Sequence, residues 1–299
     1  MEKEKTIMQK EIMSPGEKAF DIVNGILLTL LGITVLYPFI YVLSASISSG
    51  AAVDAGKVVL LPQGINFEAY EQILKDKYFW MSYGNTFFYT IFGTAYSMLI
   101  SIPAAYVLAK KRFRFRKQIN IILSFTMWFN VGFIPKYLNY KSLGAINNRW
   151  MIIVSFGVQA FNIILLRNYF ESIPQSLEEA AKIDGASDFQ ILAQIFLPLS
   201  KPALTTVSLY YALSRWNGYF WSSVLLKEKG KIPLQVYLKQ KLIDMSIVSE
   251  NATTVVGQNY SYTTLVYAII VCSIIPIILI YPYIQKYFTK GILVGGVKE

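Results

Sequence analysis

The residues Ile22–Val53 read IVNGILLTLLGITVLYPFIYVLSASISSGAAV and include no charged side chain. A helix that crosses the apolar layer of a bilayer needs about 20 residues of this kind. The stretch is therefore long enough to span a membrane. It predicts that the chain is an integral membrane protein and not a water-soluble domain.

The composition of the whole chain supports this prediction. Of its 299 residues, 54% are apolar and only 15% are charged, whereas soluble domains carry about a quarter charged residues. This excludes a disordered chain, a collagen-like fibre and a disulfide scaffold, and argues against a cytoplasmic enzyme. The formal net charge of +10 is typical of anchoring at the cytoplasmic membrane face, and we do not expect nucleic-acid binding. With one cysteine, Cys272, and no histidine, the chain can form no internal disulfide and has no imidazole chemistry.

Long apolar runs recur along the chain and predict an all-α integral membrane protein with six transmembrane helices. A β-barrel would show short alternating segments instead. The predicted spans are Phe20–Ser44, Tyr83–Ala109, Gln118–Tyr137, Trp150–Asn168, Ala203–Ser223 and Thr264–Ile284. We expect one membrane domain over residues 20–284, preceded by a cytoplasmic segment, 1–19, and followed by a cytoplasmic tail, 285–299.

The basic side chains predict the orientation, because Lys and Arg concentrate in short cytoplasmic loops. They precede the first span, follow the sixth, and crowd the link between the second and third spans. That link contains Lys110, Lys111, Arg112, Arg114, Arg116 and Lys117. Both termini are therefore expected in the cytoplasm, and the long loops 46–82 and 223–262 outside. The polar stretch Met1–Lys18 lacks the apolar core of a cleavable signal peptide.

The most informative segment is the predicted cytoplasmic loop 171–202, ESIPQSLEEAAKIDGASDFQILAQIFLPLSKP. Ser176 and Glu179 have the spacing of a capping box, in which each side chain bonds the other residue's backbone N–H. They predict a helix over about Leu177–Ile183. Gly185 is expected to end this helix in the left-handed conformation.

A second short helix is predicted directly after this glycine. Ser187 and Gln190 repeat the capping-box spacing, and the helix is expected to reach about Phe196. Pro198 and Pro202 are then expected to end it and to lead into the fifth span. Two short helices that meet at a corner would form a rigid protrusion.

The side chains of this protrusion favour docking into a partner protein. Ala180 and Ala181 allow close backbone approach, and an apolar stripe is formed by Phe189, Leu192, Ile195 and Phe196. Up to Ser200 the loop carries one cation, Lys182, against Glu171, Glu178, Glu179, Asp184 and Asp188. The alternative is an amphipathic elbow on the membrane surface. An acidic helix suits anionic headgroups poorly, so a cleft in another protein is the better fit.

The sequence contains no motif for nucleotide binding or catalysis. The nearest approach to a phosphate-binding loop, from Gly50 to Lys57, has five residues between its glycines where the motif needs four, and Val58 replaces the hydroxyl. No Cys/His cluster has metal-ligand spacing, and a serine triad would lack its histidine. We expect no catalytic, cofactor-binding or metal-binding residues. If ATP drives transport, another chain must bind it.

Several short groups of residues in the loop stand at a spacing that is typical of a known motif and extends over about 24 residues. They are Glu179-Ala180-Ala181, Asp184-Gly185-Ala186, Ile195, Leu197-Pro198 and Pro202. They resemble the EAA loop of permease subunits of ATP-binding-cassette importers. The resemblance extends over most of the chain to permeases of the carbohydrate-uptake type, similar to the smaller permease of maltose importers. Within that type it favours the branch for polygalacturonan, aldouronate or other complex oligosaccharides.

The resemblance implies the type I importer permease fold and assigns roles in docking on an ATPase subunit. The coupling residues that it implies are Glu178, Glu179, Ala180, Ala181, Asp184, Gly185, Ala186, Ile195, Leu197 and Pro198. Glu179 would lie nearest the moving loop of the ATPase. The tail would reach along the ATPase dimer interface through Gly295, Gly296, Val297 and Lys298.

The resemblance also implies partners. These are a second, non-identical permease, two ATPase subunits that would hold ATP and magnesium, and an extracellular solute-binding protein that would deliver an oligosaccharide and touch residues 251–262. One alternative is a permease for amino acids, phosphate or metal ions. Another is a membrane enzyme or channel that acts alone.

Arg215 lies well inside the fifth predicted span and is followed by Trp216 and Asn217. An ionisable group at that depth suggests a functional site. It could meet a sugar, particularly an acidic one, through charge-assisted hydrogen bonds and ring stacking. Alternatively, it snorkels or bonds backbone carbonyls of the partner permease. Asn130 is a further candidate for the substrate path, although buried amides often only link helices.

Overall fold

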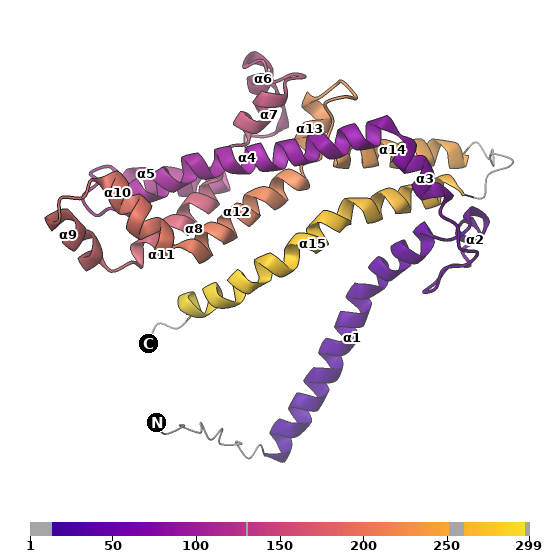
Figure 1. Ribbon diagram of the computed structural model, residues 1–299, viewed down its shortest axis with the longest axis horizontal. Helices are drawn as coiled ribbons and strands as arrows, with labels where there is room; N and C mark the ends of the chain where they lie inside the picture. The colour runs from indigo at the N-terminus through magenta and orange to yellow at the C-terminus, as the bar shows by residue number, and fades with distance from the viewer. Residues whose placement is uncertain (1–13, 130, 251–259, 297–299) are drawn as a thin grey trace. The chain divides into compact units, whose positions relative to one another are not determined.

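The computed structural model describes residues 14–129, 131–250 and 260–296, with all their side chains except those of residues 245–250 and 283–296. Every regular element in these ranges is a helix (Figure 1), as the predicted all-α fold requires. The longer helices are α1 (Pro15–Ser46), α4 (Lys77–Ala109), α5 (Arg116–Trp128), α8 (Ala160–Glu171), α12 (Lys201–Trp216), α14 (Leu234–Glu250) and α15 (Tyr262–Gly296). The shorter helices are α2 (Gly50–Asp54), α3 (Glu68–Lys75), α6 (Phe133–Ser142), α7 (Arg149–Ser155), α9 (Gln175–Ile183), α10 (Asp188–Ile191), a π-helical turn (Leu192–Phe196), α11 (Leu197–Leu199) and α13 (Phe220–Leu225).

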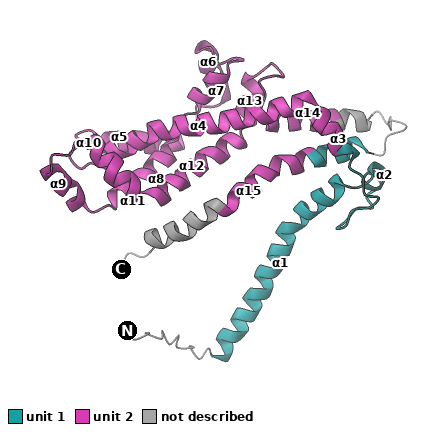
Figure 2. Cartoon of the chain, in the orientation of Figure 1, with its two compact units in different colours: residues 1–69, 254–268 teal, residues 70–253, 269–299 magenta. Residues whose placement is uncertain are grey.

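The chain divides into two compact units (Figure 2). Unit 1 comprises residues 1–69 and 254–268, and unit 2 comprises residues 70–253 and 269–299. Unit 1 has a small apolar core in which Tyr41 of α1 packs edge-to-face on Tyr267, with ring centroids 5.7 Å apart. The candidate functional residues of the predicted cytoplasmic loop all lie in unit 2.

Unit 2 is organised around α4. This helix contacts α5, α7, α8, α12 and α14, and Figure 1 shows it running beside α8 and α12. Its buried face carries small polar residues such as Ser97 and Ser101, whose size lets neighbouring helices approach closely. The Ser97 hydroxyl donates to the Gly93 carbonyl at 2.8 Å, and the Ser101 and Tyr211 hydroxyls share a hydrogen bond of 2.7 Å that joins α4 to α12.

Three described helices are long and apolar enough to cross a membrane, namely α1, α4 and the part of α15 from Tyr262 to Pro282. The total reaches five if each of two bent helix pairs is counted as one span. The six predicted spans are therefore not all confirmed. The departures fall in the predicted third, fourth and fifth spans, where the chain breaks.

The predicted third span, Gln118–Tyr137, is not a continuous helix. It divides into α5 and α6, which are bent by 116°. Gly132 precedes α6 with a φ of 78°, a backbone conformation that glycine adopts at little cost. Asn130 lies outside the described residues. Apolar composition indicates the length of such a segment but does not reveal a bend within it.

The predicted fourth span, Trp150–Asn168, divides into α7 and α8, which are bent by 51°. The last carbonyls of a helix have no partner within that helix. Here the missing hydrogen-bond donors come from Arg215 of α12. Its guanidinium donates to the carbonyls of Ile152 at 2.9 Å, Ile153 at 3.0 Å and Phe156 at 2.5 Å. The break within this span therefore has its hydrogen bonds satisfied by a side chain.

Gly93 of α4 provides the space for this guanidinium. A Cβ atom at Gly93 would lie 2.9 Å from Nε of Arg215, which is closer than two such atoms can pack. Arg215 is only 9% exposed, and a buried charge is tolerated only when hydrogen bonds replace its hydration. The glycine, the arginine and the free carbonyls of α7 thus form one arrangement, which we call the arginine clamp.

The predicted fifth span, Ala203–Ser223, is shorter than expected. The helix α12 has 16 residues and ends at Trp216, so it rises about 24 Å against an apolar layer of about 30 Å. After Asn217–Tyr219 the short helix α13 follows.

The two predicted external loops contain helices. In 46–82, α3 buries Ala69 and Ile73, which lie on one face of the helix because they are four residues apart. In 223–262, the segment before α14 is tied to α4, because Asn85 donates to the carbonyls of Gly230 at 2.8 Å and Ile232 at 3.0 Å. Within their described residues, both predicted external loops therefore contain helices and buried contacts.

The arginine clamp predicts that Gly93→Ala lowers the melting temperature of the detergent-purified protein. The added methyl group would displace the guanidinium from the carbonyls of α7, at a cost of about 1–3 kcal/mol. The matched control is Gly84→Ala in the same helix, because a Cβ atom there would meet no atom within 4 Å. Thermal unfolding followed by circular dichroism measures both variants. Equal melting temperatures for the two would contradict the clamp.

Candidate functional site

The loop between α8 and α12 folds as two short helices that meet at a glycine corner. The first, α9, begins after Pro174, and none of its first N–H groups donates a hydrogen bond to a capping side chain. The predicted capping box of Ser176 and Glu179 is therefore wrong. The helix starts earlier, because Leu177 N–H already donates to the Pro174 carbonyl at 3.2 Å. The Glu179 carboxylate instead accepts a hydrogen bond of 2.7 Å from the Gln175 amide.

The corner forms at Gly185 as predicted. Its φ is 81°, in the left-handed region that favours glycine. Gly185 N–H donates to the Lys182 carbonyl at 3.1 Å, and Ala186 N–H donates to the Ala181 carbonyl at 2.9 Å. These two bonds are those of a Schellman motif, which ends a helix and satisfies its last carbonyls. The direction of the chain at the tip of the loop is thus fixed by backbone hydrogen bonds.

The second helix begins with the predicted capping box, since Ser187 N–H donates to the Gln190 side chain at 2.8 Å and Gln190 N–H donates to the Ser187 hydroxyl at 3.4 Å. It does not end at Phe196, however. A π-helical turn, closed by Leu197 N–H on the Leu192 carbonyl, carries the chain through Pro198 into α11. The prediction that Pro198 and Pro202 end this helix is wrong, because both occupy first-turn positions of helices, where proline needs no N–H partner.

The second helix is anchored by apolar side chains. Phe196 is buried, with its ring centroid 5.0 Å from that of Tyr106 in α4 and 5.6 Å from that of Phe170 in α8. Leu192 is buried in the same core, and Ile195 packs against it. Phe189 departs from the predicted stripe, because it points away from the core and is 77% exposed. Apolar packing thus joins this helix to two long helices.

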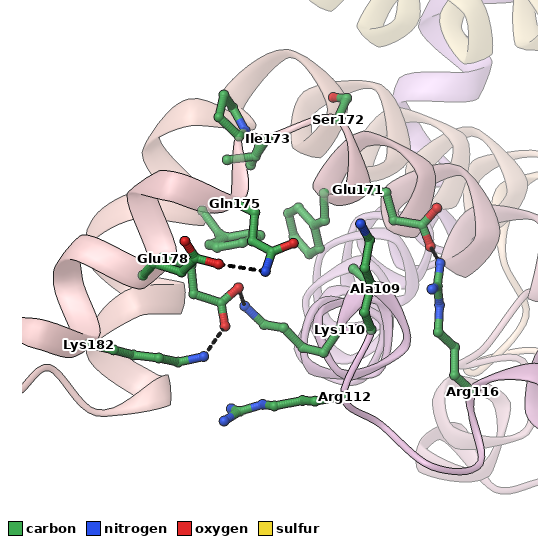
Figure 3. Close-up of a pocket in the computed structure, with 15 residues that line it drawn as sticks. Ala109, Lys110, Arg112, Arg116, Glu171, Ser172, Ile173, Gln175, Glu178 and Lys182 are labelled. Atoms are coloured by element: carbon green, nitrogen blue, oxygen red, sulfur yellow. Dashed lines mark hydrogen bonds and ion pairs between the residues drawn. The ribbon is translucent and has the colours of Figure 1, made fainter.

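Ion pairs tie the loop to the basic link between α4 and α5. Lys110 Nζ lies 2.5 Å from a Glu178 carboxylate oxygen, and Lys182 Nζ lies 2.5 Å from the other (Figure 3). Arg112 pairs with Asp188 at 2.5 Å. Arg116 and Arg167 both pair with Glu171, at 2.5 and 3.3 Å.

These ion pairs correct the prediction of an acidic protrusion. Three of its five acidic residues are neutralised within the chain by cations that the sequence suggested only as membrane anchors. Glu179 and Asp184 are both exposed and form no ion pair within the described part of the chain. The negative charge that the loop offers to a partner is thus confined to its tip.

Lys110 and Glu178 form the most buried of these pairs, with side chains 8% and 12% exposed. Burial acts to raise the pKa of the Glu178 carboxyl, but the hydrogen bonds and charges of Lys110 and Lys182 outweigh it and hold the pKa below its ordinary value. For Lys110, burial dominates and lowers the pKa, although Glu178 opposes this shift. The Lys110 ammonium also lies 3.9 Å and 4.2 Å from the ring centroids of Tyr106 and Phe196, which favours its charged form.

A pocket of about 540 Å³ opens between the ends of α4 and α8 and the helix α9 (Figure 3). Its basic lining residues are Lys110, Lys111, Arg112, Arg116 and Lys182, and its acidic ones are Glu171, Glu178 and Glu179. Most of these groups are held in ion pairs, although the basic side chains outnumber the acidic ones. The ion pairs across it make it a joint between the link and the loop.

The remaining predicted site residues lie away from this joint. Arg215 belongs to the arginine clamp, so the carbonyls that it binds come from its own chain and not from a partner permease. Trp216 is buried against Tyr83 and Phe87, with ring centroids 6.3 and 5.3 Å apart. Asn217 is exposed at the end of α12. Contact of these three residues with substrate stays a prediction.

Other predicted contacts fall at the edges of the described chain. Gly295 and Gly296 are the last residues of α15. Val297, Lys298, Asn130 and most of the predicted contact 251–262 lie outside the described residues.

Sequence reasoning missed Lys110, Arg112 and Arg116 as part of this site. It assigned the basic link and the acidic loop to the same side of the membrane but did not pair them. Opposite charges in two short loops on one side were the available signal. Gly93 gave no such signal, because its role depends on a contact with Arg215, which is 122 positions further along the chain.

Comparison with known proteins places these features in context. Residues 79–294 match the family described as binding-protein-dependent transport system inner membrane component. The polygalacturonan/rhamnogalacturonan transport system permease protein YtcP of Bacillus subtilis (strain 168) is 40% identical over 94% of this chain and 99% of its own length. Protein LplC of the same organism is 34% identical over 94% of this chain and 95% of its own length.

A solved structure is similar as well. It is a crystal structure of a bacterial ABC transporter involved in the import of the acidic polysaccharide alginate. One of its chains is 53% identical to this chain and superposes with a TM-score of 0.87, over 92% of this chain and 99% of that chain.

The joint predicts a strong energetic coupling between Lys110 and Glu178. Glu178→Gln leaves the Lys110 ammonium without its main counter-charge, so we expect a lower melting temperature than in the wild type. Lys110→Met should lower it too, and the double variant should recover part of the loss because no unpaired buried charge remains. A double-mutant cycle on the purified protein should give a coupling of about 1–3 kcal/mol.

The matched control is the cycle of Arg112→Gln with Asp188→Asn, a pair whose side chains are more than half exposed. Such exposed pairs contribute below about 1 kcal/mol. A coupling at Lys110–Glu178 no larger than at this control would refute the buried joint.

Proposed function

Because the chain belongs to the family of binding-protein-dependent transport system inner membrane components, we propose that it is the permease subunit of an ATP-driven importer of acidic oligosaccharides. It is a multi-pass membrane protein with several apolar helices. The observation that carries the proposal is the corner at Gly185, which is built by backbone hydrogen bonds and held against α4, α8 and α12 by the Phe196 core and the Lys110–Glu178 pair. A protrusion fixed in this way suits the transfer of force from a motor.

In this proposal the tip of α9 docks on an ATPase subunit. Ala180 and Ala181 allow close approach, and Glu179 and Asp184 offer the unpaired negative charge. The residues in contact with the ATPase are those of the predicted coupling set, together with the tail from Gly295 to Lys298. ATP and magnesium are held by two separate ATPase subunits, and this chain is not itself an enzyme.

The membrane organisation that we propose has six spans, with α5–α6, α7–α8 and α12–α13 as broken spans of one permease domain over residues 20–284. Both termini lie in the cytoplasm. A second, non-identical permease completes the translocation path, and the solute-binding protein contacts residues 251–262 from outside. Arg215, Trp216, Asn217 and Asn130 remain candidates for the path, with the first of them acting through the shape of the broken fourth span.

The substrate class follows from the relatives. One is described for polygalacturonan and rhamnogalacturonan, and the solved structure for alginate, which its description calls acidic. Polygalacturonan and alginate carry a carboxylate on their sugar units. These similarities favour uronate-containing oligosaccharides over neutral sugars, and they favour sugars over amino acids, phosphate or metal ions.

The test is to assemble this chain with its partner permease, the ATPase subunits and the solute-binding protein in proteoliposomes. We expect oligogalacturonates or alginate oligosaccharides to stimulate ATP hydrolysis and to accumulate inside, while neutral malto-oligosaccharides of the same length do neither. Stimulation by the neutral series alone would refute the substrate class. ATP hydrolysis or solute flux by this chain without its partners would refute the permease role.

The docking role predicts that Gly185→Val reduces the amount of ATPase that copurifies with the chain. A β-branched residue cannot adopt the φ of 81° without strain, so the corner opens. Gly144→Val is the matched control, because Gly144 also has a positive φ, of 73°, and at both glycines a Cβ atom would meet nothing within 4 Å. Both variants should lose similar stability, and only Gly185→Val should lose ATPase. Equal ATPase yields would count against docking at this corner.

A further inference from the structure

The six cations of the link between α4 and α5 fall into two groups. Lys110, Arg112 and Arg116 face the loop and pair with its acidic residues. The others, Lys111, Arg114 and Lys117, are exposed and form no ion pair among the described residues. The second group therefore presents a net positive charge that nothing in the described chain neutralises.

An exposed apolar surface begins beside these three cations. Phe115 stands between Arg114 and α5, and its ring is 55% exposed. One to two turns along α5, the exposed side chains are Ile121, Ile122 and Phe125, roughly 6–12 Å from Lys117 along the helix axis. Cations followed at this distance by aliphatic and aromatic side chains are typical of the boundary between lipid headgroups and acyl chains.

A groove connects the charged and the apolar parts. It has a volume of about 490 Å³ and is lined by Arg116, Lys117, Asn120, Ile121 and Ser124. The helix α5 begins here without a capping side chain, so the positive end of its dipole adds to the positive charge at this end of the helix. Of the three unpaired cations, Lys117 lines the groove, together with the polar Asn120 and Ser124 and the apolar Ile121.

We propose that Lys111, Arg114 and Lys117, together with this groove, bind the phosphate headgroup of an anionic phospholipid whose acyl chains lie along α5. Charge complementarity selects an anionic headgroup over a zwitterionic one. The apolar row on the same helix selects a lipid over a soluble anion or an acidic protein segment. The site lies beside the ion-paired joint, so the same link binds the coupling loop with one set of side chains and the membrane with the other.

The size of the effect follows from the number of cations. A Lys or Arg near an anionic membrane surface favours binding by an amount that corresponds to about fivefold in affinity. Removing all three cations should therefore abolish most of the enrichment of anionic over zwitterionic lipid around the protein. The enrichment in the wild type should also fall as the salt concentration rises, because salt screens exposed charges.

The experiment uses the full chain assembled with its partner subunits in vesicles that contain equal amounts of phosphatidylglycerol and phosphatidylcholine. After gentle extraction, mass spectrometry gives the ratio of the two lipids that stay bound. We expect the triple variant Lys111→Gln, Arg114→Gln and Lys117→Gln to lower this ratio at least tenfold. The charge-preserving variant Lys111→Arg with Lys117→Arg should keep it, and its melting temperature reports on the fold.

The matched control removes three exposed cations elsewhere in the chain, at Lys57, Lys141 and Lys229, and should leave the lipid ratio unchanged. An equal fall in this control, or no fall in the triple variant, would overturn the proposal. So would a triple variant that keeps phosphatidylglycerol but loses the ATPase, because the basic surface would then dock a protein. The lipid ratio requires neither substrate nor ATP, so its outcome is independent of the test of the importer function.

Discussion

A backbone carbonyl that loses its helical partner inside an apolar layer must find another donor, and the structure of unit 2 depends on this constraint. In α4, a helix of 33 residues, the regular hydrogen bonds satisfy it except opposite Pro103, which has no N–H to donate. Where the predicted fourth span breaks, three carbonyls at the end of α7 are left over, and the guanidinium of Arg215 takes them all. The arginine is tolerated in a buried place because of the break, and the break is tolerated because of the arginine. Gly93 completes the arrangement by leaving room for it.

A second constraint acts at the end of unit 2 where the loops meet. The basic link carries only positive charges and the loop mostly negative ones, so each would experience repulsion between its own like charges if it stood alone. Together they neutralise one another, most closely at Lys110 and Glu178. Each cation of the link either holds the coupling loop or faces outward, and none of the acidic residues paired with it is left for the outer surface.

The sequence predicts the fold class well, because long charge-free runs can only be helices in lipid. It also predicts the corner at Gly185 and the capping box of Ser187, since both depend on residues within five positions of each other. It fails at Ser176 and Pro198, where the local sequence fits two helix boundaries equally well and the hydrogen bonds of neighbouring residues decide which one forms. It also fails at the broken spans, because hydropathy does not indicate where a helix bends. The roles of Gly93 and Lys110 are beyond local reasoning, because each depends on a residue more than 60 positions away.

The attachment of α9 at three points has a mechanical consequence. The chain joins it to α8 on one side and, through α10 and the π-helical turn, to α12 on the other. The bond between Lys110 and Glu178 adds a third support at the end of α4. Because α9 is held at three separate points, it cannot rotate or translate independently of the helices to which it is attached. Any displacement imposed on the tip of the loop is therefore transmitted to α4, α8 and α12 together.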